Sequence, residues 1–223
     1  MAIRSGILGN LQTISARTRE HWKGIFGAHP WLSGPADSYL GFSARGGGAT
    51  GEHSHAINIW QHFAHIAGAG RVSEVFATLD MVKQDGADYD QLALLTLKTE
   101  HGLVGDVIQD VVTQPAEKSA RLQGSNGFVE WRVNHRPGHD AVLSGQGGDT
   151  IQEELIAKTR PDDFKAEIDH LACVLNGTVS QSPISLERGL DTMMVIAAAF
   201  KSHNLGRRVR IDWSAGYVPE AIL

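Results

Sequence analysis

The chain has 223 residues, of which 42% are hydrophobic and 20% are charged, a composition typical of a folded globular protein with a sizeable core. Its formal charge of -5 comes from 20 basic and 25 acidic residues without long runs, which argues against nucleic acid or an anionic membrane as a partner. One cysteine excludes an internal disulfide and no apolar stretch is long enough to span a bilayer, so we expect a cytoplasmic protein with no membrane partner.

The first 45 residues predict one strand followed by a long aromatic loop. The strand begins at Leu11, where β-branched residues show partial alternation. Residues 20–45 combine aromatic residues with prolines and glycines, which indicates an ordered loop rather than a linker. Its side chains could stack on a sugar ring or a nicotinamide, or could only pin the loop to a sheet. The aromatic residues are Trp22, Phe26, Trp31, Tyr39 and Phe42.

The remaining sequence predicts a helix, a series of strands, two more helices and a last strand. Apolar residues recur at helical spacing over residues 52–67, 164–175 and 186–202. A polar loop at 134–140 follows one of the strands and could bind substrate or form a solvated hairpin. The predicted strands cover residues 72–79, 92–99, 103–112, 120–122, 128–133, 151–157 and 209–213.

This order of elements predicts one α+β domain over residues 1–223. Consecutive strands with short glycine-containing connectors favour an open, mainly antiparallel β-sheet, with the helices packed on one face. The other face of so large a sheet needs a cover, and a second copy of the chain is an economical one. We therefore expect a homo-oligomer that forms through the sheet face.

A glycine run at residues 46–51 matches the G-x-G-x-x-G pattern of dinucleotide-binding proteins. That fingerprint follows a buried strand at the start of a βαβ unit, and neither the preceding nor the following sequence has this form. We expect no cofactor-binding residue here. The run could be a flexible turn before a helix, or it could let the backbone pass close to a substrate or to the nicotinamide end of a cofactor.

The glycine run is followed directly by four residues, Glu52-His53-Ser54-His55, which are the densest group of acid-base side chains in the chain. An enzyme that oxidises an alcohol needs a base for the hydroxyl proton, and histidine titrates in the useful range. His55 is our candidate base, and Glu52 could orient it or hold a substrate hydroxyl. Alternatively, Glu52 and Ser54 only cap the helix and the histidines are solvated.

Metal binding by the histidines of this segment is a further alternative, because four imidazoles fall within thirteen residues. Two of them lie two helical turns beyond the others, and no Cys or carboxylate completes a familiar zinc pattern. We therefore expect no metal site. The four are His53, His55, His62 and His65.

Several segments in this order resemble the C-terminal domain of the Gfo/Idh/MocA family, named for glucose-fructose oxidoreductase, inositol dehydrogenase and a rhizopine catabolism protein. The resemblance covers nearly the whole chain. It rests on residues 5–9 (SGILG), 46–58 (GGGATGEHSHAIN), 123–131 (QGSNGFVEW), 185–190 (SLERGL) and 197–202 (AAAFKS).

The resemblance implies the substrate-binding and oligomerisation part of an oxidoreductase that acts on a sugar, cyclitol or related polyol. NAD or NADP would be bound mainly by an N-terminal Rossmann domain, which this chain lacks and which could be a separate subunit. Without it we expect no hydride transfer. A non-catalytic carbohydrate- or protein-binding sheet module that has lost redox function is the alternative.

The family pattern places an acid and a histidine at the start of the helix, which implies catalytic roles for Glu52 and His55. The family usually has an aspartate four residues before the histidine, whereas Glu52 is three before it, and Asn58 stands where an aspartate is common. The candidate substrate-binding residues are His53, Asn58, Trp31, Tyr39 and Arg45.

Overall fold

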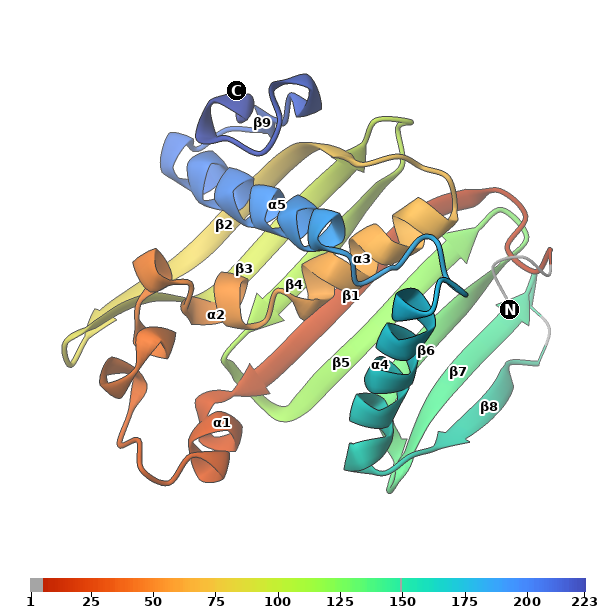
Figure 1. Cartoon of the computed structure of the whole chain (residues 1–223), viewed down its shortest axis with the longest axis horizontal. Helices are drawn as coiled ribbons and strands as arrows, with labels where there is room; N and C mark the ends of the chain where they lie inside the picture. The colour runs from red at the N-terminus through yellow and green to blue at the C-terminus, as the bar shows by residue number, and fades with distance from the viewer. Residues whose placement is uncertain (1–5, 149) are drawn as a thin grey trace.

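The computed structural model describes residues 6–148 and 150–223, and these form one sheet of nine strands with helices on one side (Figure 1). The strand order is β8-β7-β6-β5-β1-β4-β3-β2-β9. Neighbouring strands are antiparallel except for β1 and β4, which are parallel. The strands are β1 (Leu11–His21), β2 (Val72–Gln84), β3 (Ala87–Thr99), β4 (Val104–Asp110), β5 (Val112–Gly124), β6 (Gly127–Arg136), β7 (His139–Gln146), β8 (Gln152–Ala157) and β9 (Val209–Arg210).

Helices α3 and α5 cover the middle of the sheet and one of its sides (Figure 1). The predicted α+β fold is confirmed, with a mainly antiparallel open sheet and these helices on one face. Of the residues that carry the resemblance, Ser5 lies outside the described part. The helices are α1 (Trp22–Ala28), α2 (Gly48–Glu52), α3 (His55–Ile66), α4 (Arg160–Leu175) and α5 (Leu186–Leu205).

The core lies between these two helices and the sheet, and strand alternation builds it. Ile14 and Ala16 of β1 point toward the helices and are fully buried. Trp60 of α3 packs on them, and its indole Nε1–H donates a hydrogen bond of 2.8 Å to the Ile14 carbonyl. A Cβ at Gly105 of β4 would overlap both partners of this bond. The glycine therefore allows α3 to lie close to the sheet.

Several predicted elements differ from the structure: β7 was not predicted, and β5 begins at Val112 rather than at residue 120. The helix predicted over residues 52–67 is two helices, because the chain turns at His53 and Ser54. The aromatic loop contains α1, whose glycines obscure the helical pattern. The polar segment at 134–140 forms the hairpin that was one of its two predicted roles, with Arg136 of β6 paired to His139 of β7. Asp140 lies buried there beside Lys158, with a distance of 3.0 Å between Nζ and Oδ2.

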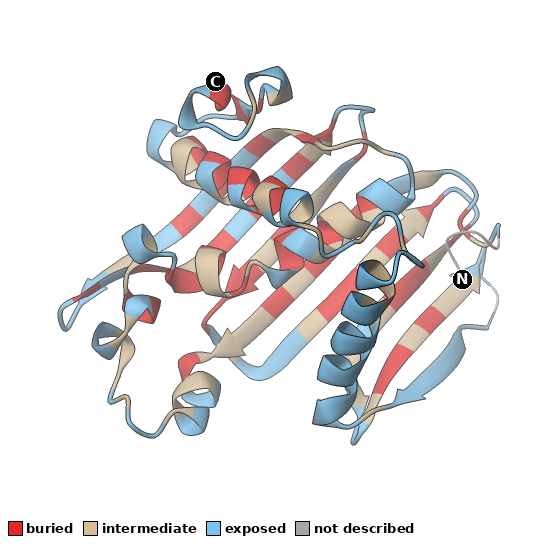
Figure 2. Ribbon diagram, in the orientation of Figure 1, coloured by how far each residue is buried: buried red, intermediate tan, exposed pale blue. Residues whose placement is uncertain are grey.

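Helix α4 differs from α3 and α5, because its apolar side chains contact little of the described chain. It lies in front of the sheet and is pale blue along most of its length in Figure 2. Leu175 is 88% exposed and Ile168 is 64% exposed. An amphipathic helix normally buries this face. The apolar stripe of α4, defined as Phe164, Ile168, Leu171 and Leu175, is therefore free to contact another protein surface.

Candidate functional site

The glycine run is held in place by a buried carboxylate from β3. Asp90 is fully buried, and its Oδ2 accepts hydrogen bonds from Thr50 N (2.6 Å) and Thr50 Oγ1 (2.7 Å). Its Oδ1 accepts a third bond from Ser43 Oγ (2.7 Å). Burial raises the pKa of the Asp90 carboxyl, and these hydrogen bonds oppose that rise. Asp90 therefore joins Ser43, before the run, to Thr50 within the run, in α2.

The glycines of the run allow its backbone to lie close to other residues of the same chain. Gly48 has a φ of +74°, and a Cβ there would overlap the carboxylate of Asp90. A Cβ at Gly47 would overlap the carbonyl groups of Tyr39 and Leu40. These glycines therefore allow close packing within the chain, and the helix that follows, α2, has only five residues. That the run binds no dinucleotide remains a prediction.

Glu52 ends α2 and is bonded to the aromatic loop. The Tyr39 hydroxyl donates a hydrogen bond of 2.8 Å to Glu52 Oε2, and this bond is the main reason that the pKa of Tyr39 is raised. The Tyr39 side chain is exposed. The structure thus places a carboxylate and a phenol together at the surface, where both can meet a hydroxylated ligand.

His53 lies in the turn between α2 and α3 and is only 1% exposed. Neither ring nitrogen has a hydrogen-bond partner among the described residues. Glu20 Oε1 lies 3.6 Å from His53 Nδ1, and Lys118 Nζ lies 3.0 Å from Glu20 Oε2. Burial lowers the pKa of His53 and outweighs the opposing effect of Glu20. Direct contact between His53 and a ligand would require this turn to open.

His55 begins α3 and is exposed, so it is accessible to a ligand. The alternative in which Glu52 and Ser54 only cap the helix is not supported. The Ser54 side chain makes no capping hydrogen bond, and the Glu52 carboxylate is bonded to Tyr39. The catalytic roles of Glu52 and His55 remain predictions.

The other predicted substrate-binding residues contact different parts of the chain. Asn58 Nδ2 donates a hydrogen bond of 3.2 Å to Thr192 Oγ1 on α5. Trp31 is exposed and packs edge-on against His29, with 5.2 Å between ring centroids. The Arg45 guanidinium lies 4.2 Å from the centre of the Phe42 ring. Their roles in substrate binding also remain predictions.

The loop aromatics do not all behave alike. Trp22 is buried and packs against Phe26 and Tyr89, with ring centroids 5.4 and 5.6 Å away. For this residue the structure supports the pinning role, because it joins the loop to β3. Trp31 and Tyr39 remain available to a ligand.

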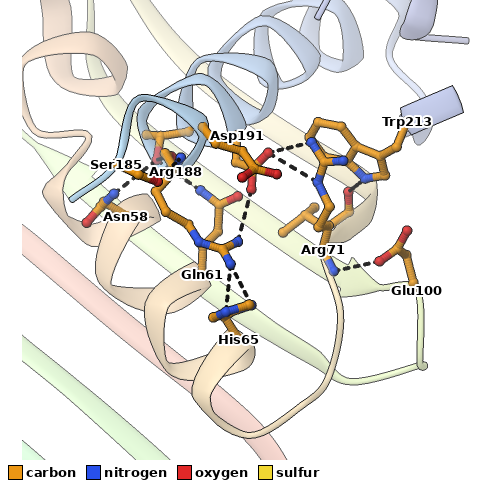
Figure 3. A network of polar contacts seen from close by, with 12 residues as sticks. Asn58, Gln61, His65, Arg71, Glu100, Ser185, Arg188, Asp191 and Trp213 are labelled. Carbon is orange, nitrogen blue, oxygen red and sulfur yellow. Dashed lines mark hydrogen bonds and ion pairs between the residues drawn. The ribbon is translucent and has the colours of Figure 1, made fainter. Parts of the chain in front are cut away.

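A polar cavity of about 710 Å³ lies beside the second half of α3. Its walls come from α3, the segment 180–185, the start of α5 and Arg71. Asp191 of α5 organises one side (Figure 3): it accepts hydrogen bonds from Arg71 Nη2 (2.5 Å) and Arg188 Nη1 (3.3 Å). The Arg71 guanidinium also stacks on Trp213, 3.5 Å from the ring centre. Sequence reasoning missed this cavity, because its walls are distant in the chain.

Two histidines of α3 line the cavity as well. Arg188 Nη2 donates a hydrogen bond of 2.6 Å to His65 Nε2. This bond requires that Nε2 carries a free lone pair rather than a proton. Burial and, secondly, Arg188 lower the pKa of His65, and burial followed by His65 and Arg188 lowers that of His62. Both rings are therefore neutral hydrogen-bonding groups in this cavity at neutral pH.

No group of three or more His, Cys, Asp or Glu side chains within residues 6–148 and 150–223 is placed to hold a metal ion. No helix in the same residues is long and apolar enough to cross a membrane.

The family model described as "GFO/IDH/MocA C-terminal domain" matches residues 1–130, more than half of the chain. The chain belongs to this family. The predicted resemblance is therefore confirmed. No curated protein matches the chain.

Solved structures share the fold of this Gfo/Idh/MocA C-terminal domain at low sequence identity. Aldose-aldose oxidoreductase from Caulobacter crescentus, solved with glycerol, has a TM-score of 0.71 and 20% identity, over 94% of this chain and 58% of its own. Levoglucosan dehydrogenase with NADH and levoglucosan has a TM-score of 0.69 and 16% identity, over 93% and 60%. An inositol dehydrogenase homolog from Azotobacter vinelandii, with NADH and myo-inositol, has a TM-score of 0.62 and 16% identity, over 94% and 59%. The Gfo/Idh/MocA domain described here thus spans about three fifths of these chains.

Proposed function

We propose that this Gfo/Idh/MocA domain binds the substrate of an NAD(P)-dependent oxidoreductase that acts on a sugar, cyclitol or related polyol. The observation that carries the proposal is the exposed His55 at the start of α3, in a domain of this family, close in sequence to the bonded pair Glu52 and Tyr39. Neighbours of the same fold were solved with levoglucosan, myo-inositol and glycerol, which supports a polyhydroxylated substrate.

The chemistry of this proposal divides between binding and proton transfer. A polyol offers hydroxyl groups that both donate and accept hydrogen bonds, and the Glu52 carboxylate and the Tyr39 hydroxyl complement them. His55 is exposed and can accept the proton of the reacting hydroxyl as a general base. His53 is buried in the turn between α2 and α3 and packs inside it rather than contacting the substrate directly.

The nicotinamide cofactor is assigned to a dinucleotide-binding domain outside the described structure. Neighbours were solved with NADH, whereas the glycine run of this chain packs closely against Asp90 and the carbonyls of Tyr39 and Leu40. The neighbours extend well beyond the part that this chain matches. We expect such a domain to dock on the apolar stripe of α4, and a second copy of the chain to cover the open face of the sheet. Phe76 and Leu94 are exposed on that face.

The alternative function is a carbohydrate-binding module without redox activity. The packing of the glycine run against its own chain is consistent with it. Both functions predict a bound polyol, and they differ in whether His55 takes part in turnover.

Substrate binding can be tested on the chain itself by NMR of ¹³C-labelled histidine rings, with the His55 signal assigned from a His55→Gln variant. We expect myo-inositol or glucose to shift this signal in a saturable way, and Tyr39→Phe to weaken binding by about 3- to 10-fold, the effect of one lost hydrogen bond. The matched control is Thr159→Val, which also removes a hydroxyl bonded to a carboxylate, that of Asp162 at the start of α4. An unmoved His55 signal with every polyol would refute the proposal.

Catalysis is tested after the chain is combined with a dinucleotide-binding domain that restores polyol oxidation. His55→Ala should then lower turnover by about 100-fold or more, the scale of a lost general base. Unchanged turnover in this variant would reject the assignment of His55. Tight, saturable binding of NADH by the chain alone would contradict the assignment of the cofactor to another domain.

A further inference from the structure

The polar cavity beside α3 lies along the same helix face as His55. At 3.6 residues per turn, His55, Asn58, His62 and His65 fall within one side of α3. Asn58 lies less than one turn after His55 and lines the cavity, as do His62 and His65. A ligand held at His55 can therefore extend along this face of the helix into the cavity.

The length of this face exceeds a single sugar ring. With a rise of 1.5 Å per residue, His62 lies roughly 10 Å along the helix axis from His55, and His65 roughly 15 Å. A monosaccharide at His55 cannot reach both histidines of the cavity. The volume of about 710 Å³ is within the usual range for small-molecule sites and has room for a further ring.

The groups that line the cavity match a neutral, hydroxyl-rich ligand. The side-chain nitrogens of Asn58 and Gln61 both donate to Thr192 Oγ1, at 3.2 and 3.1 Å, which leaves their carbonyl oxygens free to accept. The neutral ring of His62 makes no hydrogen bond to another described residue, and Ser180 adds an exposed hydroxyl. Amide, imidazole and hydroxyl groups complement sugar hydroxyls, which both donate and accept.

Charge in the cavity is balanced, which argues against an anionic ligand. Arg71 and Arg188 are both bonded to Asp191, and Glu187 adds a second carboxylate to the lining. Two cations and two anions leave no net charge to hold a phosphate or a sugar acid. The Arg71 guanidinium is further fixed by its stacking on Trp213, so this wall is already ordered before a ligand binds.

We propose that this cavity is a second sugar subsite, and that the substrate is a glycoside of at least two rings rather than a monosaccharide. The reacting ring lies at His55, and a second, neutral ring fills the cavity between α3 and the start of α5. The inference rests on the proposed function, because it takes the polyol at His55 as the first ring.

The test compares glucose with the disaccharides maltose, cellobiose and trehalose, using the full chain and the histidine NMR signals described above. At least one disaccharide should bind about 10-fold or more tightly than glucose and should shift the signals of His62 and His65 as well as His55. Glucose should shift His55 alone. His62→Gln should weaken the disaccharide by about 3- to 10-fold and leave glucose unchanged.

A second variant, Gln181→Ala, removes an exposed side chain of the cavity wall and guards against a folding defect in the first; it should also weaken the disaccharide and leave glucose unchanged. The inference is overturned if glucose and all three disaccharides shift His55 alike while His62 and His65 stay unmoved. It is also overturned if glucose 6-phosphate shifts His62 and His65 more strongly than any disaccharide. If no sugar shifts His55, the proposed function itself fails, so the two failures are distinguishable.

Discussion

Replacing His53 by leucine should stabilise the domain, and more so in acid than at pH 8. The side chain is 1% exposed, and neither ring nitrogen has a partner among the described residues. An unsatisfied buried polar group costs about 1–3 kcal/mol, whereas an apolar side chain of similar size carries no such cost. Glu20 keeps its ion pair with Lys118 after the substitution. At pH 8 we therefore expect the free energy of unfolding to rise by about 1 kcal/mol.

The pH dependence follows from the lowered pKa of His53. Below its ordinary pKa of 6.5, the unfolded chain binds a proton at this residue that the buried ring resists. The free energy of unfolding is therefore not reduced by proton binding at His53 above pH 6.5. It decreases as the pH falls from 6.5 toward the pKa of His53 in the folded chain. One proton over 1.5 pH units amounts to at most about 2 kcal/mol at pH 5. The leucine variant loses this contribution to acid sensitivity.

Urea unfolding followed by tryptophan fluorescence at pH 8 and pH 5 measures both effects. The other histidines contribute to the acid sensitivity of the wild type and of the variant alike, so the difference between the two proteins isolates His53. His55→Leu is the matched control, because the same change at this exposed position should alter stability by less than about 0.5 kcal/mol. Equal loss of stability between pH 8 and pH 5 in wild type and His53→Leu would refute the reasoning.

Two further predictions use matched pairs of substitutions and the same unfolding assay. Gly48→Ala should destabilise the domain by at least about 2 kcal/mol, because it combines strain at positive φ with overlap against Asp90, whereas Gly24→Ala in α1 has open space and should be neutral or stabilising by up to about 1 kcal/mol. A loss of stability well below 2 kcal/mol in Gly48→Ala would contradict the packing around Asp90. Ile57→Ala in the core should cost about 2–5 kcal/mol, whereas Ile168→Ala on α4 should change stability by less than about 0.5 kcal/mol. A large cost at Ile168 would show that α4 is buried in solution.

The sequence predicted the fold well where local pattern and packing agree. Alternating strands with a buried face, such as β6, and helices with an apolar stripe, such as α5, were recognised because their periodicity reflects one buried side. The turn at His53 was not, because the apolar pattern continues across it and the break depends on Gln109 and Asp90, which lie on distant strands. Helix α4 was predicted from a stripe that the described chain leaves exposed.

For the candidate site, the sequence identified the segment but not its environment. Glu52, His53 and His55 are adjacent in the chain, yet one is bonded to Tyr39, one is buried and one is exposed. The Glu20 and Lys118 neighbours of His53 come from β1 and β5, and only strand register brings them together. The helical spacing of the α3 histidines was visible in the sequence, whereas the opposite wall of the cavity was not.

One buried amide of β4 holds in place the turn that precedes His55. Gln109 is fully buried; its Oε1 accepts a hydrogen bond of 3.2 Å from Ile57 N, in the first turn of α3. Its Nε2 donates to the carbonyls of Ala49 and Thr50 in α2, at 3.2 and 3.3 Å. The amide thereby satisfies a helix-start N–H that has no partner within the helix and joins both helices to the sheet. Because the sheet holds the turn, His55 is presented without a loop that must be ordered on binding, which favours affinity for a ligand laid along α3.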